Sequence, residues 1–192
     1  MRQALRSIIG IRLLLSLAVV SSLFTVIENF KTEYGQLYML HYISSPQVLG
    51  ILWGIYSFTW AFGSFIAHRL QTRATLLMVL AVVPLIFMSL FDSRVGLALF
   101  MVQATAAAAL ANIIETRVQD STPSSVRASI LSILSWSGRL ISVPAVLLMG
   151  ALITSHDILW ALRFTTGIAC FILLFWLVNA QSRKPSRQIQ TN

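Results

Sequence analysis

The chain has 192 residues, of which 57% are hydrophobic and only 10% charged, and its mean hydropathy is +0.80. A soluble domain carries ~25% charged residues, so this composition excludes a soluble protein and predicts an all-α integral membrane protein with one membrane domain, residues 1–192. The net charge of +8 gives no nucleic-acid surface, because the basic residues cluster at the ends of apolar segments. We therefore expect the lipid bilayer, and not nucleic acid, as the immediate partner.

The first expected membrane span covers residues 13–40. Its purely apolar part ends before Glu28, which makes it shorter than the ~20 residues that a crossing helix needs. If the helix continues to residue 40, Glu28 and Thr32 fall on one polar stripe, with Lys31 one turn from Glu28. In the alternative, the helix ends near Ile27 and the charged residues that follow form a solvated loop.

Five more apolar segments follow along the chain. The expected spans are residues 47–67, 74–91, 95–115, 128–153 and 158–179, followed by a basic tail at 180–192. The segment 47–67 has small residues at steps of three or four, which predicts a close helix contact. These residues are Gly50, Gly54, Ser57 and Ala61.

The basic residues predict how the spans are oriented, since cytoplasmic loops are enriched in lysine and arginine. One side of the membrane receives Arg2, Arg6, Arg12, Arg69, Arg73, Arg117, Arg127, Arg183, Lys184 and Arg187. The other side receives Lys31, Arg94 and Arg163. We therefore expect six spans in the cell (inner) membrane, with both termini in the cytoplasm.

Polar and ionisable residues inside the expected spans are candidates for a substrate or ion pathway. Glu28 and Glu33 are carboxylates in the first span, and a desolvated carboxyl can exchange protons near neutral pH. Lys31 lies where it can hold Glu28 ionised, although the pair could equally be structural. Gln103 and Asn112 lie among alanines in the span 95–115.

Arg139 is the deepest fixed charge in the expected spans. It lies twelve residues beyond Arg127, or ~18 Å at ~1.5 Å per residue, near the middle of a hydrocarbon layer ~30 Å thick. An arginine at that depth must face protein or water, so we expect an interior charge paired with a carboxylate or with helix carbonyls.

Enzyme chemistry is not expected from this sequence. The three histidines lie in three different turns and the single cysteine, Cys170, lies in an apolar segment, so no metal site is predicted. Ser137 and Gly138 resemble half of an intramembrane protease site, but no histidine lies in a span to act as the base. No glycine-rich phosphate loop is present, and no cofactor is expected.

Three stretches resemble transporters of the major facilitator superfamily. The segment Gln119-Asp120-Ser121-Thr122-Pro123, followed by Val126-Arg127-Ala128-Ser129-Ile130-Leu131-Ser132 and then Gly138-Arg139, resembles the turn and entry of helix eleven. Glu33-Tyr34, Leu37-Tyr38, Ser45-Pro46 and Gly50 resemble helix seven and the start of helix eight in drug-efflux-like members. Gly63-Ser64 and Ala67-His68-Arg69-Leu70 resemble the turn from helix eight to helix nine, with Ala67 near the place of the family's aspartate.

The resemblance covers nearly the whole chain but only the second half of a twelve-helix transporter. It implies helices seven to twelve, built as two inverted three-helix repeats, and transport of a small solute by alternating access, commonly proton-driven efflux or antiport. It also implies an inner-loop gating role for Arg69, Arg73, Glu115, Asp120 and Arg127.

Six helices supply only half of the cavity that such a fold encloses. We therefore expect a complementary six-helix half or a second copy of the chain as a partner. The alternative is a non-transporting membrane scaffold or a truncated remnant of a transporter, in which the polar residues only hold helices together.

Overall fold

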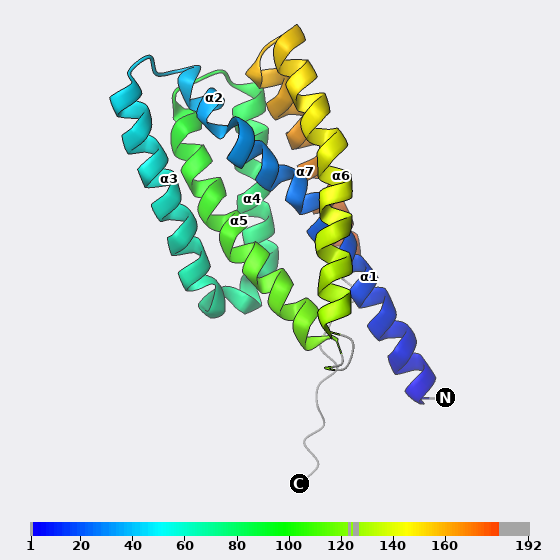
Figure 1. Cartoon of the computed structure of the whole chain (residues 1–192). Helices are drawn as coiled ribbons and strands as arrows, with labels where there is room; N and C mark the ends of the chain where they lie inside the picture. Colours follow the sequence, from blue (N-terminus) through cyan, green and yellow to red (C-terminus); the bar gives the residue numbers. More distant parts are fainter. Residues whose placement is uncertain (1, 123, 125–126, 181–192) are drawn as a thin grey trace.

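The computed structural model describes residues 2–122, 124 and 127–180, with side chains from residue 16 to residue 179 within these ranges. The expected tail at 180–192 lies outside this description except for the backbone of Ala180. The described part of the chain is helical and contains no strand. The helices pack into one bundle, in which neighbours along the chain mostly run antiparallel (Figure 1).

The helices lie where the sequence predicts apolar segments. They are α1 Arg2–Asn29, α2 Gly35–Leu40, α3 Pro46–Ile66, α4 Ala74–Leu90, α5 Val95–Asp120, α6 Arg127–Ser155 and α7 Ile158–Ala180. The largest difference among the later segments is in α5, which continues five residues beyond the expected end at 115. Because α5 continues to Asp120, Arg117 and Asp120 lie on its last turn and not in a loop.

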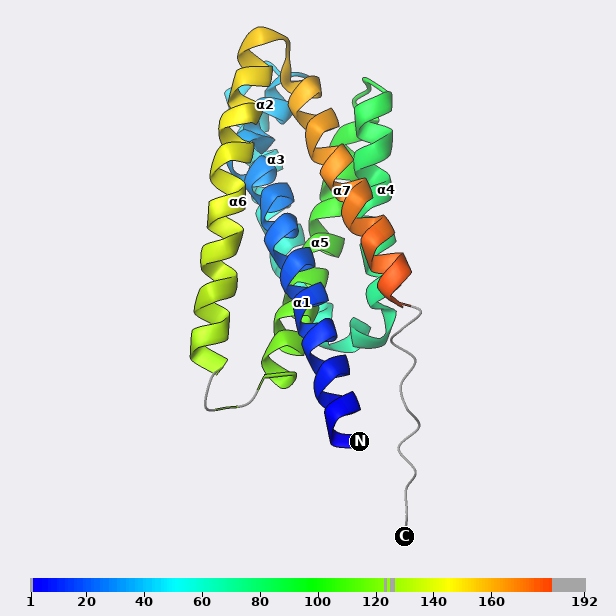
Figure 2. The ribbon, with the colours of Figure 1, turned by 90° about the vertical axis from the view of Figure 1, so that its right-hand side faces the viewer.

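Four segments of the described chain are long and apolar enough to cross a membrane: Pro46–Leu90, Val95–Asp120, Arg127–Ser155 and Ile158–Asn179. The first of these combines α3 and α4, which are joined by the 3₁₀ segment η2, Ala67–Arg73. Figures 1 and 2 show that α3 and α4 run in opposite directions on either side of η2. The protein is therefore compatible with several membrane crossings.

The first predicted span is a continuous but irregular helix. Helix α1 is followed without a turn by the π-helical segment η1, Phe30–Tyr34, and then by α2, which ends at Leu40. The alternative in which the helix ends near Ile27 is wrong. The sequence did not predict the π segment, nor that the helix starts at Arg2 and not near residue 13.

Helix α5 lies in the centre of the bundle, against α3 on one side and α4 on the other. Its small side chains allow this close packing, and the alanines Ala104, Ala106, Ala107, Ala108 and Ala109 are all buried. Helix α3 approaches it at Gly63, where a Cβ atom would collide with the carbonyl oxygen of Thr105. The contact can therefore form only because residue 63 is a glycine.

The opposite face of α3 has no partner among the residues that the structure describes. The four small residues that predicted a close helix contact, Gly50, Gly54, Ser57 and Ala61, are all exposed. A Cβ atom added at Gly50 or Gly54 would meet no atom within 4 Å. The helix contact that α3 makes with α5 uses Gly63 instead, so the predicted small-residue seam is not formed in this chain.

Candidate functional site

The irregular first helix carries a buried ion pair. The ammonium nitrogen of Lys31 lies 2.7 Å from Oε1 of Glu28, one turn earlier, and the Lys31 side chain is 0% exposed. Lys31 belongs to η1, where the helix widens to π geometry and rotates the residues that follow. Single π turns inside α-helices are frequent at functional sites. The predicted relation between Glu28 and Lys31 is thus confirmed as an ion pair.

An aromatic ring completes the surroundings of the Lys31 ammonium group. Nζ lies 4.6 Å from the centroid of the Trp60 ring, which α3 contributes. Apart from their mutual contact, Nζ of Lys31 and Oε1 of Glu28 have no hydrogen-bond partner among the described residues. An ammonium group in contact with a π face is stabilised, more so when water is excluded. Sequence analysis missed Trp60, since nothing in one sequence pairs an α3 aromatic with a lysine of the first helix.

Glu28 also opens onto a cavity between α1, α5 and α6. The cavity has a volume of about 310 Å³, and its walls are mainly apolar. Its polar lining consists of Ser21, Thr25 and Glu28 from α1, Glu115 from α5 and Ser135 from α6. The charged residues that line it are therefore both acidic. Glu28 therefore contacts the buried ammonium group of Lys31 and also lines the cavity.

Contacts of α6 with α1 and with η1 hold one wall of this cavity in place. The hydroxyl groups of Ser22 and Ser137 lie 3.0 Å apart, and the hydroxyl of Tyr34 donates to the carbonyl of Val146 at 2.9 Å. Between these contacts, Gly138 packs so closely on Thr25 that a Cβ would lie 3.0 Å from its hydroxyl oxygen. The small and hydroxylated residues of α6 therefore fix the position of the helix that carries Glu28.

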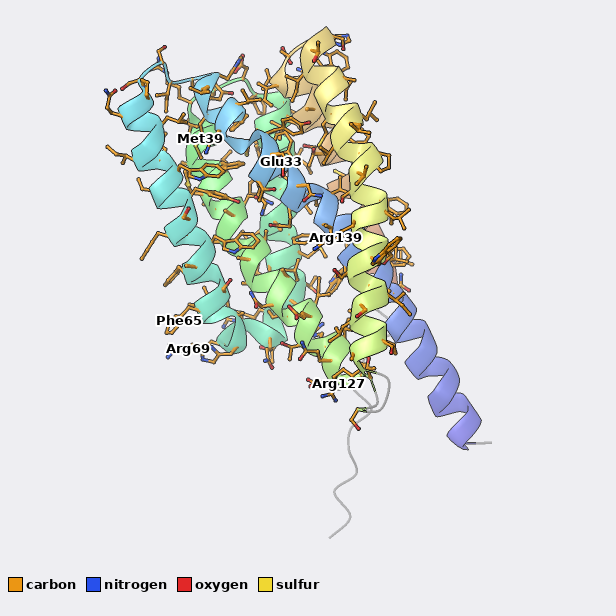
Figure 3. All side chains as sticks on the ribbon, in the orientation of Figure 1. Glu33, Met39, Phe65, Arg69, Arg127 and Arg139 are labelled. Atoms are coloured by element: carbon orange, nitrogen blue, oxygen red, sulfur yellow. The ribbon has the colours of Figure 1, made fainter. Side chains whose placement is uncertain are left out.

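The second predicted carboxylate, Glu33, is exposed and forms no ion pair among the described residues. Figure 3 shows it on the α1–α2 helix, on the face of the bundle that also presents α3 and α5. Positions 31 and 33 are two residues apart and so lie on opposite sides of the helix, with Lys31 toward the core and Glu33 outward. The structure brings Lys31 together with Glu28 and not with Glu33.

The expectation of a buried, paired charge at Arg139 is wrong within this chain. The side chain is exposed and takes part in no ion pair among the described residues. Arg139 lies midway along α6 (Figure 3), at the edge of the face that packs on α1. The adjacent Gly138 and Ser142 are the residues that are buried. The small residues of α6 therefore pack on α1 and leave the arginine beside them uncovered.

Gln103 and Asn112 differ from each other in their environment. Gln103 is 0% exposed, and neither atom of its amide has a hydrogen-bond partner among the described residues. Asn112 is exposed, and its Nδ2 atom donates to the hydroxyl of Ser64 at 3.1 Å and to the carbonyl of Ala108 at 2.9 Å. Asn112 thus ties α5 to α3. Neither residue lines the cavity that Glu28 opens onto.

The five residues expected to gate the inner loops lie at one end of the bundle, where Figure 3 marks Arg69 and Arg127. All five are exposed, and none forms an ion pair among the described residues. Sequence analysis gave no such role to Arg117, whose Nη2 atom donates to the carbonyl of Gln71 in η2 at 2.8 Å. Arg117 is therefore the residue that links the end of α5 to the connection between α3 and α4.

The opposite end of the bundle has a polar cluster that the sequence did not predict. The Tyr42 hydroxyl donates to Oδ1 of Asp92 at 2.8 Å, and Nε2 of His41 lies 3.2 Å from the same oxygen. Burial raises the pKa of the Tyr42 hydroxyl, and its hydrogen bond to Asp92 raises it further. The cluster joins the turn after α2 to the turn before α5, two segments that are far apart in the sequence.

No group of three or more metal-ligating side chains forms among the described residues. Comparison of the chain with family models, with curated proteins and with solved structures gives no match.

Proposed function

We propose that this chain is a multi-pass protein of the cell membrane that carries out proton-coupled transport of a small solute, as one half of a transporter of the major facilitator type. In this proposal six segments cross the membrane: the α1–η1–α2 helix and each helix from α3 to α7. Both termini lie in the cytoplasm, at the end of the bundle that carries Arg69, Arg73, Arg117 and Arg127. The two three-helix repeats are residues 2–90 and 95–180.

The observation that carries the proposal is the buried Glu28–Lys31 pair at the wall of a cavity. Placing two ions away from water has a desolvation penalty that their attraction only partly offsets, so such a pair is weak evidence for a purely stabilising role. Ionisable residues inside membrane helices are rare, face the bundle interior or a water-filled cavity, and mark substrate and proton pathways. Glu28 has both features of such a pathway residue, because it pairs with a buried cation and opens onto a cavity.

The same geometry suggests how a proton could be coupled to a solute. When Glu28 accepts a proton it loses its charge, and Lys31 then keeps only the Trp60 ring as a neighbour of its ammonium group. A buried cation without a counterion is unfavourable, so protonation of Glu28 favours a rearrangement of the helix around η1. In the proposed cycle this rearrangement links the protonation of Glu28 to the switch between a bundle open on one side and a bundle open on the other.

The lining of the cavity favours a cationic solute with an apolar body. Glu28 and Glu115 supply negative charge, while Phe24, Ile114 and Leu134 supply apolar contact. A cation that reaches Glu28 competes with both the proton and Lys31 for the same carboxylate. This competition is the basis of exchange between a proton and a cation.

The exposed faces of the bundle support a partner. The small-residue face of α3 is open, and α6 exposes Ile133, Trp136, Leu140 and Leu147 in addition to Arg139. Close packing of small residues and polar contacts drive helix association in membranes, where lipid tails are as apolar as leucine. A complementary six-helix half or a second copy of the chain fits this surface.

The test is transport by membrane vesicles from cells that lack the chain and from cells in which it is restored, so that any partner is present. The probe is ethidium, a fluorescent cation with an apolar body, in vesicles with an imposed pH gradient. Vesicles with the chain should move ethidium in response to the gradient at several times the rate of vesicles without it. Equal rates would contradict the proposal.

The coupling residue is tested with the double variant Glu28→Gln/Lys31→Met, because Glu28→Gln alone would leave Lys31 buried without a counterion. The double variant should insert normally and lose the gradient-driven flux. The matched control is Glu33→Gln, which changes an exposed carboxylate on the same helix and should keep the flux. If the double variant transports as well as the wild type, Glu28 does not couple protons to the solute.

The alternative is a membrane scaffold in which the polar residues only hold helices together. It is favoured by the complete burial of Lys31 and by the Asn112–Ser64 hydrogen bond, both of which connect helices. In that case the double variant and the wild type would both fail to move ethidium, and removing the pair would change only the stability of the bundle.

A further inference from the structure

A second cavity lies on another face of the bundle, between α7 and α1. It has a volume of about 370 Å³ and is lined by Leu23 of α1 together with residues of α7. The α7 residues form two adjacent rows at steps of four, so they make one stripe along the helix. They are Arg163, Phe164, Gly167, Ile168 and Phe171. Figure 2 shows α1 and α7 beside each other on the face turned toward the viewer.

The guanidinium group of Arg163 is held from one side only. Its Nε atom donates to the carbonyl of Ser89 in α4 at 3.3 Å, and its Cζ atom lies 5.2 Å from the centroid of the Trp160 ring. The two Nη atoms form no hydrogen bond or ion pair among the described residues. The carboxylate of Asp157 at the start of α7 is engaged with the backbone, accepting from the amides of Leu159 and Trp160. An oriented arginine fork is left free to bind an anion.

The depth of Arg163 is that of the membrane interface. Helix α7 begins at Ile158, so Arg163 lies five residues, or ~7.5 Å, from the start of the helix. Trp160, which is 44% exposed, lies one turn closer to that end. Tryptophan is enriched at the level of the lipid headgroups, and arginine near helix ends extends toward the same layer.

Below the arginine the cavity becomes apolar. Phe164, Ile168 and Phe171 on α7 face Leu23 on α1 across it. Gly167 leaves this space open, because a Cβ atom added there would meet no atom within 4 Å. A free phosphate ion would use only Arg163 and leave these walls uncovered.

We propose that this groove binds one glycerophospholipid, with its phosphate on the free guanidinium fork of Arg163 and an acyl chain between α7 and α1. The positive charge of Arg163 favours the phosphate, and the apolar walls below it favour the acyl chain. The proposal does not depend on transport, since the groove shares no residue with the cavity at Glu28.

The experiment is native mass spectrometry of the purified, delipidated full chain in detergent. The probes are dioleoyl-phosphatidylglycerol, dioleoylglycerol, which has the same chains without phosphate, and glycerol phosphate, which has the phosphate without chains. The chain should retain one phosphatidylglycerol and bind both other probes at least ~10-fold more weakly, since a charge-assisted hydrogen bond contributes ~1.5 kcal/mol or more. Equal retention of phosphatidylglycerol and dioleoylglycerol would overturn the role of the phosphate, and equal binding of glycerol phosphate would overturn the role of the acyl chain.

Two variants with matched controls locate the site. Arg163→Gln should weaken phosphatidylglycerol retention ~10-fold, whereas Arg94→Gln, at an exposed arginine near the same end of the bundle, should not. Gly167→Leu should fill the open groove and abolish retention without a steric clash, whereas Gly54→Leu places the same side chain in open space on α3.

If Arg163→Gln does not yield folded protein, Gly167→Leu decides the question alone. Unchanged retention in folded Gly167→Leu would overturn the proposal. Equal loss of the lipid in Gly167→Leu and Gly54→Leu would also overturn the proposal. So would a co-purifying protein, and not a lipid, in the groove.

Discussion

Helices α5 and α6 are both long, apolar and interrupted by polar residues, yet they are buried to very different extents. In the most apolar 18-residue stretch of each helix, 56% is buried in α5 but only 17% in α6. Helix α5 is surrounded because its alanines allow α3 and α4 to approach, whereas α6 uses a narrow row of small residues to pack on α1 and α7. The difference separates a helix that builds the bundle from one that offers most of its surface to lipid or to a partner.

The largest expected effect is at the close approach of α3 to α5. Gly63→Val should destabilise the bundle by about 3 kcal/mol, because its side chain would collide with the Thr105 backbone and the helices would have to separate. Gly54→Val is the control, since its side chain enters open space on the same helix. The measurement is the thermal unfolding midpoint in detergent. Equal midpoints for the two variants would show that α5 is not closely packed on α3.

A smaller effect separates equivalent leucines on the two helices. Leu110 of α5 is 0% exposed and Leu147 of α6 is 69% exposed. Leu110→Ala should lower the free energy of unfolding by about 2 kcal/mol, the low end of the range for a buried leucine, because it leaves a cavity, and Leu147→Ala by less than about 0.5 kcal/mol. The comparison is made by denaturant titration of the purified chain. If Leu147→Ala lowers the free energy of unfolding as much as Leu110→Ala does, the surface of α6 around Leu147 is covered in the purified chain.

The smallest effect is expected at Arg139. Arg139→Lys keeps the charge but loses the planar fork, and the side chain makes no ion pair that the change would break. The free energy of unfolding should therefore change by less than about 0.5 kcal/mol in the isolated chain. A loss well above this value would reveal a bidentate contact. A defect confined to membranes that contain the partner would place the contact in that partner.

Much of the fold could be predicted because helices in a long apolar chain follow hydrophobic runs. The bounds of α3 and α7 lie within about one residue of the expected segments, since turn residues and charges end these runs clearly. The pair Glu28–Lys31 was also predictable, because a spacing of three residues places both side chains on one helix face.

The sequence did not reveal which of several equally polar residues would be buried. The π segment at 30–34 has no sequence signature, and helical periodicity does not say that other helices cover the face with Lys31 and leave the face with Glu33 exposed. Arg139 was expected in the interior from its depth, but depth does not say whether the neighbouring surface is covered by this chain. Trp60 and Arg117 depend on contacts between helices that are distant in sequence, which periodicity cannot supply.

The central claim is that Glu28 is the carboxylate at which a proton and a cationic solute compete. The most direct test is the affinity of the purified chain for ethidium as a function of pH, measured by fluorescence anisotropy between about pH 9 and about pH 5. The affinity of the wild type should fall as the pH is lowered, by at most about tenfold per pH unit, because protonation removes the charge that the cation needs. Glu115→Gln, which changes the other carboxylate of the cavity, should keep this dependence, and Glu28→Gln/Lys31→Met should bind weakly and without it. If the double variant keeps the wild-type pH dependence, another group binds the proton and the account is wrong.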